Sequence, residues 1–262
     1  MNRTAMILAA GLGTRLKELT KDKPKALVEV AGKTLLQRNI ENLLQNGFDT
    51  IIVNIHHFGD QIIRFLEIRN SEFGMRNDDS LSSNQFRIPN SEFRIYISDE
   101  RGCLMDTGGG IVQALPFFHD SQAVLVHNVD ILSDVDLKAH YDAFIDSGDD
   151  AWLLTQDRDT SRKLLFDENG LLVGWRNLKD GQFKWVNGFQ EKYKELAFNG
   201  MHIFNSSIFE VFPYQRYSII DLYLELAKHH KIRSKEIHPG FWFDIGKAEE
   251  FERINAELGK RN

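Results

Sequence analysis

Two glycines one residue apart, followed closely by an arginine, are the part of this 262-residue chain best suited to bind phosphate. Gly11, Gly13 and Arg15 come directly after the apolar run Met6–Ala10. Phosphate binding needs backbone N–H groups that converge without a Cβ in the way, and glycine permits both the dihedral angles and the close approach. Arginine adds a planar, permanently charged fork for phosphate oxygens. The segment is therefore a candidate phosphate-binding loop.

The spacing of this loop matches neither of the two common nucleotide-binding fingerprints. A dinucleotide-binding loop needs a third glycine that is missing here, and a P-loop ends in Gly-Lys-Ser/Thr. The glycines alone fit a tight strand-to-helix turn equally well, with Arg15 in solvent. Both interpretations stay open at this point.

A second basic element lies ten residues after Arg15. Lys21, Lys23 and Lys25 surround Pro24, which fixes its own φ and biases the preceding residue away from helix. A stiff loop of this kind can direct Lys25 back over the glycine loop. The alternative is a solvated lysine cluster, which is the usual state of such a run.

Two aspartates follow apolar runs and are candidates for binding a metal ion. Asp130 follows the run AVLVHNV, and Asp244 follows the aromatic run Phe241–Phe243. Open α/β sheets place ligand sites at the carboxyl ends of their strands. Magnesium binds a few carboxylates together with phosphate oxygens and water. Each aspartate also fits an N-cap or a turn residue.

Three consecutive glycines open a predicted helix at Asp106–Gly110. They would let a flat base or ribose approach the main chain, and Asp106 or Thr107 can cap the helix. A flexible turn is the alternative interpretation.

The N-terminal stretch MILAAGLGTRLKELTKDKPKALVEVAGKTLL resembles the signature of the nucleoside-diphosphate-sugar pyrophosphorylases. The shared pattern is Gly-x-Gly-Thr-Arg, then Pro-Lys, then Gly-Lys before a helix. The resemblance implies that Gly11, Gly13 and Thr14 bind a nucleoside triphosphate. It also implies two catalytic residues, with Arg15 meeting the leaving pyrophosphate and Lys25 the transferred α-phosphate.

The resemblance extends to the nucleoside. It implies backbone contacts from Leu8 and Ala10. The segment DTGGG is similar to the Glu-Thr-Gly-Gly-Gly element beside the nucleoside in one subgroup, which includes N-acetylmuramate-1-phosphate uridylyltransferase and bacterial mannose-1-phosphate guanylyltransferases. Asp106, Gly108 and Gly109 would then bind nucleotide, with Asp106 as a shortened acid.

Both aspartates also match elements of the resembled family. The segment VLVHNVDIL is similar to a strand that usually ends Asn-Gly-Asp, and FWFDIG resembles Trp-x-Asp-Val-Gly. Asp130 and Asp244 would each bind Mg²⁺. Val129 stands where glycine is usual, which leaves the backbone path beside Asp130 in question.

The sequence evidence for sugar-binding residues is weaker than that for the nucleotide-binding residues. The segment FNGMHI is similar to an Ala/Ser-Gly-Ile element that lines the sugar pocket, so Asn199 and Gly200 would bind sugar. A strand interior is the alternative for Asn199. We find no clear counterpart of the Glu-Lys pair used by several hexose-specific members. Trp175, Trp185 and Trp242 are expected to pack at the core or an edge.

The composition fits a globular protein that does not act mainly on nucleic acid. Hydrophobic residues make up 42% and charged residues 27%, and the net charge is −6. A small anionic substrate then needs a local cluster of Lys and Arg. The single cysteine, Cys103, excludes an internal disulfide. Without a run near the ~20 apolar residues that a membrane span needs, we expect a cytoplasmic protein without a membrane partner.

Alternating strands and helices predict an α/β fold with a mostly parallel, Rossmann-like sheet flanked by helices, the nucleotidyltransferase (GT-A-like) fold. The expected strands are 6–10, 50–55, 93–97 and 124–126, and the expected helices are 34–45, 59–66, 110–118, 136–147, 218–229 and 247–258. Short runs within 151–185 predict a small antiparallel extension for the sugar. We expect residues 70–90 to form a long surface loop.

Taken together, we expect a single domain over residues 1–262, with a nucleotide-binding half to about 135 and a sugar-phosphate-binding half from about 136. The resemblance implies an enzyme that converts a nucleoside triphosphate and a sugar 1-phosphate to a nucleoside-diphosphate sugar and pyrophosphate, in the synthesis of cell-envelope or polysaccharide precursors. The alternatives are a cytidylyltransferase for a non-sugar phosphate such as phosphocholine and a non-catalytic subunit that binds nucleotide sugars. A homo-oligomer is compatible with the sequence.

Overall fold

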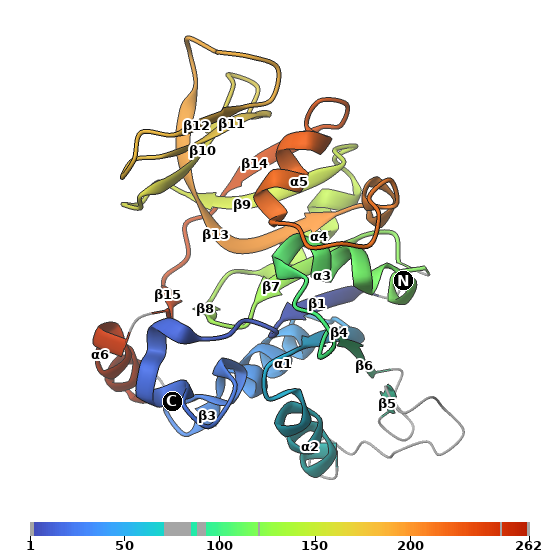
Figure 1. Ribbon diagram of the computed structural model, residues 1–262, viewed down its shortest axis with the longest axis vertical. Coiled ribbons are helices and arrows are strands. Elements are labelled where there is room, and N and C mark those ends of the chain that lie inside the picture. Colours follow the sequence, from blue (N-terminus) through green and yellow to red (C-terminus); the bar gives the residue numbers. More distant parts are fainter. Residues whose placement is uncertain (1–2, 71–84, 88–92, 120, 247, 261–262) are drawn as a thin grey trace.

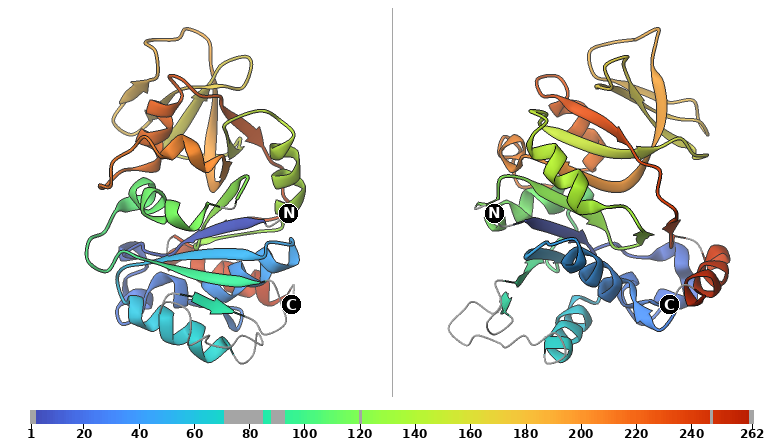
Figure 2. Two further views of the ribbon diagram at one scale, coloured as in Figure 1. Left: turned by 90° about the vertical axis from the view of Figure 1, so that its right-hand side faces the viewer. Right: turned by 180° about the vertical axis from the view of Figure 1, so that it is seen from behind.

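The computed structural model describes residues 3–70, 85–87, 93–119, 121–246 and 248–260. In these residues one eleven-stranded sheet runs through the molecule, with helices on both faces (Figures 1 and 2). The spatial order is β12-β11-β10-β13-β7-β1-β4-β6-β5, and β9 pairs with β13 and β14. The strands are β1 (Thr4–Leu8), β4 (Thr50–Ile55), β5 (Gln85–Arg87), β6 (Arg94–Asp99), β7 (Val124–Asn128), β9 (Ala151–Gln156), β10 (Arg162–Phe166), β11 (Leu172–Asn177), β12 (Phe183–Trp185), β13 (Lys194–Phe204) and β14 (Ile232–Glu236).

The centre of the sheet is parallel, as the alternation of strands and helices predicts. Strands β7, β1, β4 and β6 lie side by side in parallel register. Every residue of β1 and β4 is buried, which explains why their sequences are mostly apolar rather than alternating between apolar and polar residues. The carboxyl ends of β1, β4 and β7 therefore meet at one edge, where the glycine loop begins. Beyond β7 the sheet becomes antiparallel through β13, β10, β11 and β12, which confirms the predicted extension.

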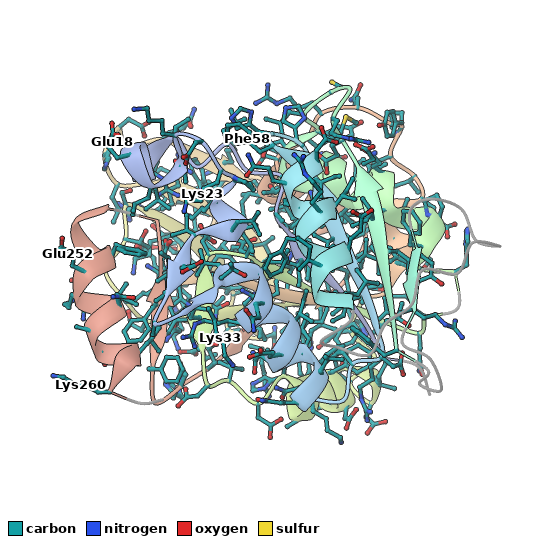
Figure 3. The ribbon with its side chains drawn as sticks, turned by 90° about the horizontal axis from the view of Figure 1, so that it is seen from below. Glu18, Lys23, Lys33, Phe58, Glu252 and Lys260 are labelled. Carbon is teal, nitrogen blue, oxygen red and sulfur yellow. The ribbon has the colours of Figure 1, made fainter. Side chains whose placement is uncertain are left out.

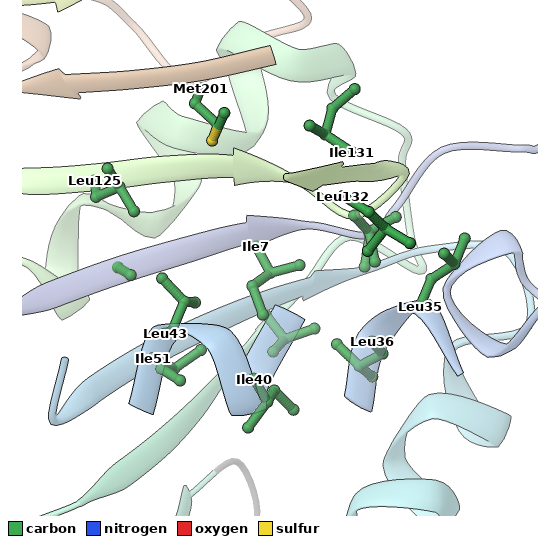
Figure 4. Close-up of a cluster of buried hydrophobic side chains, with 14 of the residues drawn as sticks. Ile7, Leu35, Leu36, Ile40, Leu43, Ile51, Leu125, Ile131, Leu132 and Met201 are labelled. Atoms are coloured by element: carbon green, nitrogen blue, oxygen red, sulfur yellow. The ribbon is translucent and has the colours of Figure 1, made fainter. Parts of the chain in front are cut away.

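Helices cover both faces of the sheet. One face carries α1 (Leu35–Gln45), α2 (Gly59–Asn70), α4 (Leu137–Ile145) and α6 (Ala248–Gly259), and the other carries α3 (Asp106–Ala114) and α5 (Ile219–Leu226). Figure 4 shows the first of these cores, where α1 packs its apolar face onto the central strands. Leu35, Leu36, Ile40 and Leu43 of α1 are fully buried. Burial of each such side chain stabilises the folded state by about 1.5–3 kcal/mol.

The shorter elements lie outside the eleven-stranded sheet. They are the two-stranded pairs β2 (Glu29–Val30) with β3 (Lys33–Thr34) and β8 (Ile131–Ser133) with β15 (Trp242–Asp244), and the 3-10 turns Thr14–Thr20, Lys25–Leu27, Leu115–Phe117 and Ser206–Phe209.

Two of the predicted helix starts are confirmed by their caps. The hydroxyl of Thr34 accepts a hydrogen bond from Gln37 N, and the carboxylate of Asp136 accepts one from Ala139 N. Each cap satisfies an amide that the first turn leaves without a helical partner.

The sequence pattern missed or misplaced three elements. Helix α3 begins at Asp106, as the predicted opening at Asp106–Gly110 implies, and not at Gly110 as in the expected helix 110–118. Strand β14 was not predicted; it joins the sheet parallel to β9. Within the stretch predicted as a loop, residues 85–87 form β5; residues 71–84 and 88–90 of that stretch lie outside the described part.

The C-terminal helix returns to the N-terminal half. Helix α6 contacts β2 and the 3-10 turn after the glycine loop, and Ala31 N donates to the side chain of Asn255. Figure 3 shows α6 beside the segment that carries Glu18 and Lys23, while Glu252 and Lys260 point into solvent. None of the described helices is both long and apolar enough to cross a membrane.

Replacing Gly110 with alanine is expected to lower the free energy of unfolding by up to about 2 kcal/mol. The added Cβ would lie 2.6 Å from Oε1 of Glu100 and 3.0 Å from Nδ2 of Asn54. Overpacking costs about 1–3 kcal/mol, and the higher helix propensity of alanine offsets about 1 kcal/mol of that. Denaturant unfolding measures the change. Gly102→Ala is the matched control, because its Cβ would meet no atom within 4 Å; equal effects of the two substitutions would refute the packing argument.

Candidate active site

A cavity of about 410 Å³ opens at the carboxyl edge of the parallel strands. Its walls come from the glycine loop, from the ends of β4 and β7, and from the start of α3. The lining residues are Leu8, Ala10, Gly11, Leu12, Gly13, Thr14, Arg15, Leu16, Lys25, Asn54, Glu100, Leu104, Asp106, Thr107, Asn128, Val129, Asp130, Arg216 and Gly246. The fold therefore brings together residues that lie more than two hundred positions apart.

The glycine loop is folded tightly against the segment that carries Lys25. Gly13 has a φ of +64°, and a Cβ there would lie 3.0 Å from Cγ2 of Thr20 and 3.3 Å from Cβ of Lys25. Glycine is thus required both by the left-handed backbone and by the close approach. Lys25 is buried and lines the cavity, whereas Lys21 is exposed at the surface. The catalytic role of Lys25 stays a prediction.

Lys25 forms an ion pair across the cavity wall. Its Nζ donates to Oδ2 of Asp130, and both side chains are largely buried. A buried amine is held in one position when a carboxylate partner fixes it, and removal of either partner leaves an uncompensated charge. The pair therefore links the loop after β1 to the end of β7.

Val129 stands where the Asn-Gly-Asp element of the resembled family has glycine, and it fits this position without backbone strain. Its side chain is buried in the core below the sheet edge, and its φ is not positive. Its amide donates to Leu8 O at 3.2 Å, and its carbonyl accepts from the side chain of Asn39 at 3.0 Å. Both backbone groups are satisfied, so Asp130 is presented on a regular turn between β7 and β8.

Asp244 lies next to this ion pair. Burial, and then the neighbouring carboxylate of Asp130, raise the pKa of Asp244 above its ordinary value, while Lys25 and Arg15 act in the opposite direction. Oδ1 of Asp244 is buried without a hydrogen-bond partner among the described residues. Gly246 keeps the region open, since a Cβ there would lie 2.6 Å from that oxygen and 3.4 Å from Arg15.

A buried network fixes the start of the glycine loop from below. The side-chain oxygen of Asn54 accepts hydrogen bonds from Ala9 N at 2.6 Å and Ala10 N at 3.2 Å. Its amide donates to Oε1 of Glu100 at 2.6 Å, and Oε2 of Glu100 accepts from Met105 N at 3.2 Å. The network ties the loop after β1 to the segment before α3.

The pKa of Glu100 predicts a pH dependence of stability. Burial raises the pKa of Glu100 above its ordinary value near 4.5. The folded state then keeps a proton that the unfolded state releases, so this carboxyl contributes most below pH 4.5, and its contribution is lost as pH rises through the raised pKa. We expect the free energy of unfolding of the wild type, relative to Glu100→Gln, to fall as pH rises above 4.5. Denaturant titrations from pH 4 to 8 measure the difference; a constant difference would contradict the assignment.

The start of α3 is arranged differently from the sequence-based expectation. Asp106 and Thr107 line the cavity, and Asp106 has a φ of +62°. Gly108 and Gly109 face away from the cavity, packed on residues 215–219, and their amides donate to Tyr217 O. Thr107 N donates to Oδ1 of Asp106 at 2.7 Å, so the first turn is satisfied partly by the side chain of Asp106 and partly by a backbone carbonyl from outside the helix. Direct contacts of these two glycines with nucleotide stay a prediction.

The two residues predicted to bind sugar lie in an irregular part of β13. The pairing of β13 with β9 shifts register between Phe198 and His202, and Gly200 has a φ of +83°. A Cβ at Gly200 would lie 3.0 Å from Nδ2 of Asn128 in the cavity wall. Asn199 is buried, and its Nδ2 has no hydrogen-bond partner among the described residues. The bulge joins the cavity to the second half; sugar binding stays a prediction.

The sequence pattern missed Asn54, Glu100 and Arg216 as cavity residues. Asn54 carried a usable signal, because it is a polar residue inside the β-branched strand TIIVNI. Arg216 lies in an irregular segment, with Nε 4.0 Å from Asp106 Oδ2, and nothing in its local sequence marks it.

Comparison with known proteins gives consistent matches over nearly the whole chain. The family model described as nucleotidyl transferase matches residues 4–261. An N-acetylmuramate α-1-phosphate uridylyltransferase of Caulobacter vibrioides is 31% identical over 98% of both chains. The mannose-1-phosphate guanylyltransferase catalytic subunit β of Drosophila melanogaster is 24% identical over 94% of this chain and 60% of its own length. The crystal structure of HddC from Yersinia pseudotuberculosis complexed with GMP-PN superposes with a TM-score of 0.70 at 21% identity, covering 98% of this chain and 99% of that one.

Proposed function

Because this chain belongs to the nucleotidyl transferase family, we propose that it joins a sugar 1-phosphate to a nucleoside triphosphate, forming a nucleoside-diphosphate sugar and pyrophosphate. The sugar 1-phosphate is proposed from the relatives, whose names state N-acetylmuramate 1-phosphate and mannose 1-phosphate. UTP is the first nucleotide to test, since the uridylyltransferase matches over its whole length. The product would serve as a precursor of the cell envelope or of a polysaccharide.

One observation carries this proposal. The glycine loop, Arg15, Lys25 and Asp130 line a single cavity, and Asp244 lies beside them. Both substrates are anions, and the net charge of the chain is −6, so the reaction needs local cations at the point of transfer. A non-catalytic nucleotide-sugar subunit would need the cavity but not this charged set.

The residues beside the cavity fit a magnesium ion. Asp130 and Asp244 are close enough for one carboxylate to raise the pKa of the other, and Oδ1 of Asp244 is buried without a partner among the described residues. No group of three or more His, Cys, Asp or Glu side chains in the described residues could hold a metal. A two-carboxylate set suits Mg²⁺, which takes its other ligands from phosphate and water. When bound, Mg²⁺ would neutralise developing charge on the phosphate oxygens.

The side chains would act mainly by positioning and by charge neutralisation. An oxygen of the sugar 1-phosphate attacks the α-phosphorus in line, the α–β bond breaks, and pyrophosphate leaves with the electron pair. The attacking oxygen is already an anion, so no general base and no covalent enzyme intermediate are needed. Arg15 would bind the leaving pyrophosphate. Lys25, held by Asp130, would bind the transferred α-phosphate.

A panel assay tests the proposal. Each of UTP, GTP, CTP and dTTP is combined with sugar 1-phosphates and with phosphocholine, and pyrophosphate release is measured with and without Mg²⁺. We expect Mg²⁺-dependent release with at least one sugar 1-phosphate. Release with phosphocholine alone would indicate the cytidylyltransferase, and the absence of release with every pair would indicate the binding subunit.

A further inference from the structure

Besides Arg15 and Lys25, a third cationic side chain acts on Asp244, and it comes from the antiparallel half. The guanidinium carbon of Arg158 lies 4.3 Å from the ring centroid of Trp242, and one terminal nitrogen donates to Phe198 O at 3.0 Å. The side chain is half-buried. Stacking on an indole and one backbone hydrogen bond fix the plane of the guanidinium.

The irregular part of β13 makes this position possible. The pairing of β13 with β9 shifts register directly after Phe198, and the carbonyls of Phe198 and Asn199 accept hydrogen bonds from side chains there. Phe198 O accepts from Arg158, and Asn199 O accepts from Nε1 of Trp242 at 3.1 Å. Nζ of Lys163 holds the loop before β10 by donating to Arg158 O at 2.7 Å. A bulge that directs side chains in this way is a common feature beside binding sites.

The same strand positions Arg158 relative to the proposed metal-binding carboxylate. Trp242 and Asp244 are two residues apart on β15, so their side chains leave the same face of the strand. Arg158 and Asp244 act on each other electrostatically: each shifts the pKa of the other toward its charged form. Burial lowers the pKa of Arg158, but an arginine stays protonated.

Arg158 keeps hydrogen-bonding capacity that the described residues do not use. Apart from the bond to Phe198 O, its guanidinium has no hydrogen bond or ion pair with them. The neighbouring Nδ2 of Asn199 is also without a partner among them. A buried donor without a hydrogen-bond partner lowers the stability of the folded state. The planar guanidinium group can donate two parallel hydrogen bonds to the oxygens of a phosphate.

We propose that Arg158 binds the phosphate of the acceptor, the sugar 1-phosphate. The inference rests on the proposed function and adds the group that brings the second anion to the α-phosphate. Arg15 and Lys25 belong to the loop after β1, the proposed triphosphate side, so neither accounts for the acceptor. Arg158 lies on the antiparallel half and interacts electrostatically with the same carboxylate, Asp244, without an ion pair to it. An acceptor phosphate bound to Arg158 would lie near Asp244, the proposed metal ligand. The positive charge of Arg158 would reduce the electrostatic repulsion between this phosphate and the triphosphate.

Steady-state kinetics with the active pair from the panel separates acceptor binding from a structural role. We expect Arg158→Ala to raise the KM for the sugar 1-phosphate about 10–100-fold and to leave the KM for the nucleoside triphosphate within about twofold. Arg158→Lys keeps the positive charge but loses the two parallel donors of the guanidinium group, so its KM for the sugar 1-phosphate should lie between those of the wild type and Arg158→Ala. Arg233→Ala is the control. Arg233 lies on β14, donates to a backbone carbonyl, that of Asn169, and forms an ion pair with Asp149. Its replacement should leave both KM values unchanged.

A binding experiment decides the inference independently of turnover. Inorganic phosphate is titrated calorimetrically into the protein after the nucleotide cavity has been filled with Mg²⁺ and an α,β-methylene analogue of UTP. We expect saturable binding to the wild type and at least tenfold weaker binding to Arg158→Ala. Equal phosphate affinity in the two proteins, or an equal rise of both KM values, would overturn the role of Arg158. A wild type that binds phosphate but turns over no pair would contradict the proposed function and not the phosphate site.

Discussion

Replacing Lys25 with alanine is expected to lower kcat by about 1000-fold or more while nucleotide binding changes little. The ammonium group is buried in the cavity wall and paired with Asp130, so it is held in place for the proposed contact with the α-phosphate. Preorganised donors of this kind contribute about 10²–10³ in kcat each, and a full charge in a buried site contributes more. Stopped assays of pyrophosphate release, with nucleotide titrations beside them, measure the two effects.

The control for Lys25 lies two residues away. Lys23 precedes the same proline but does not line the cavity, so Lys23→Ala should keep kcat within about twofold. Far-UV circular dichroism and denaturant unfolding show whether each variant is folded. A folded Lys25→Ala protein with more than a tenth of the wild-type kcat would remove Lys25 from the catalytic role.

Replacing Asp244 with asparagine is expected to abolish Mg²⁺-dependent turnover without loss of stability. The substitution removes a carboxylate whose pKa is raised by burial and by Asp130. A raised carboxyl pKa means that ionisation opposes folding at neutral pH, so the metal-free variant should be equally stable or more stable than the wild type. Activity should fall at least about 100-fold, because one of two protein ligands for the metal is lost.

In the Asp244 variant, Mg²⁺-dependent activity should fall while the stability of the metal-free protein stays equal or rises. This combination separates a metal-binding role from a structural one. Asp134→Asn is the control, since that side chain accepts from Phe241 N at the other end of β15 and an amide oxygen can replace it. A loss of stability in metal-free Asp244→Asn, together with Mg²⁺ dependence equal to that of the wild type, would exclude the assignment.

Local sequence predicts the glycine loop and its basic partner because their geometry is determined within a few residues. Glycine at position 13 permits the left-handed backbone of the loop, and proline at position 24 fixes its own φ directly before Lys25. The aspartates were selected for a different reason, because each follows an apolar run. Asp130 does follow a parallel strand, β7, at the edge where such sheets place ligand sites. Asp244 instead lies on β15 of a separate antiparallel pair.

Features that depend on tertiary packing were not predicted. The sequence indicates that the glycines at 108–110 open a helix, but not that residues 215–219 pack where a Cβ of Gly108 or Gly109 would lie. Strand β13 is interrupted at Asn199 and Gly200, so its eleven residues do not show a regular alternation. Arg158 has no motif around it, and its importance arises from Trp242, more than eighty residues later in the chain.

The transfer of label from ¹⁸O-enriched sugar 1-phosphate tests the central claim most directly. The three non-bridging oxygens of the acceptor phosphate are enriched, and the products are resolved by ³¹P NMR and mass spectrometry. Attack of this phosphate on the α-phosphorus predicts that all of the label stays in the nucleoside-diphosphate sugar and none enters pyrophosphate. Label in pyrophosphate, or a nucleoside-diphosphate sugar that has lost ¹⁸O, would contradict the mechanism.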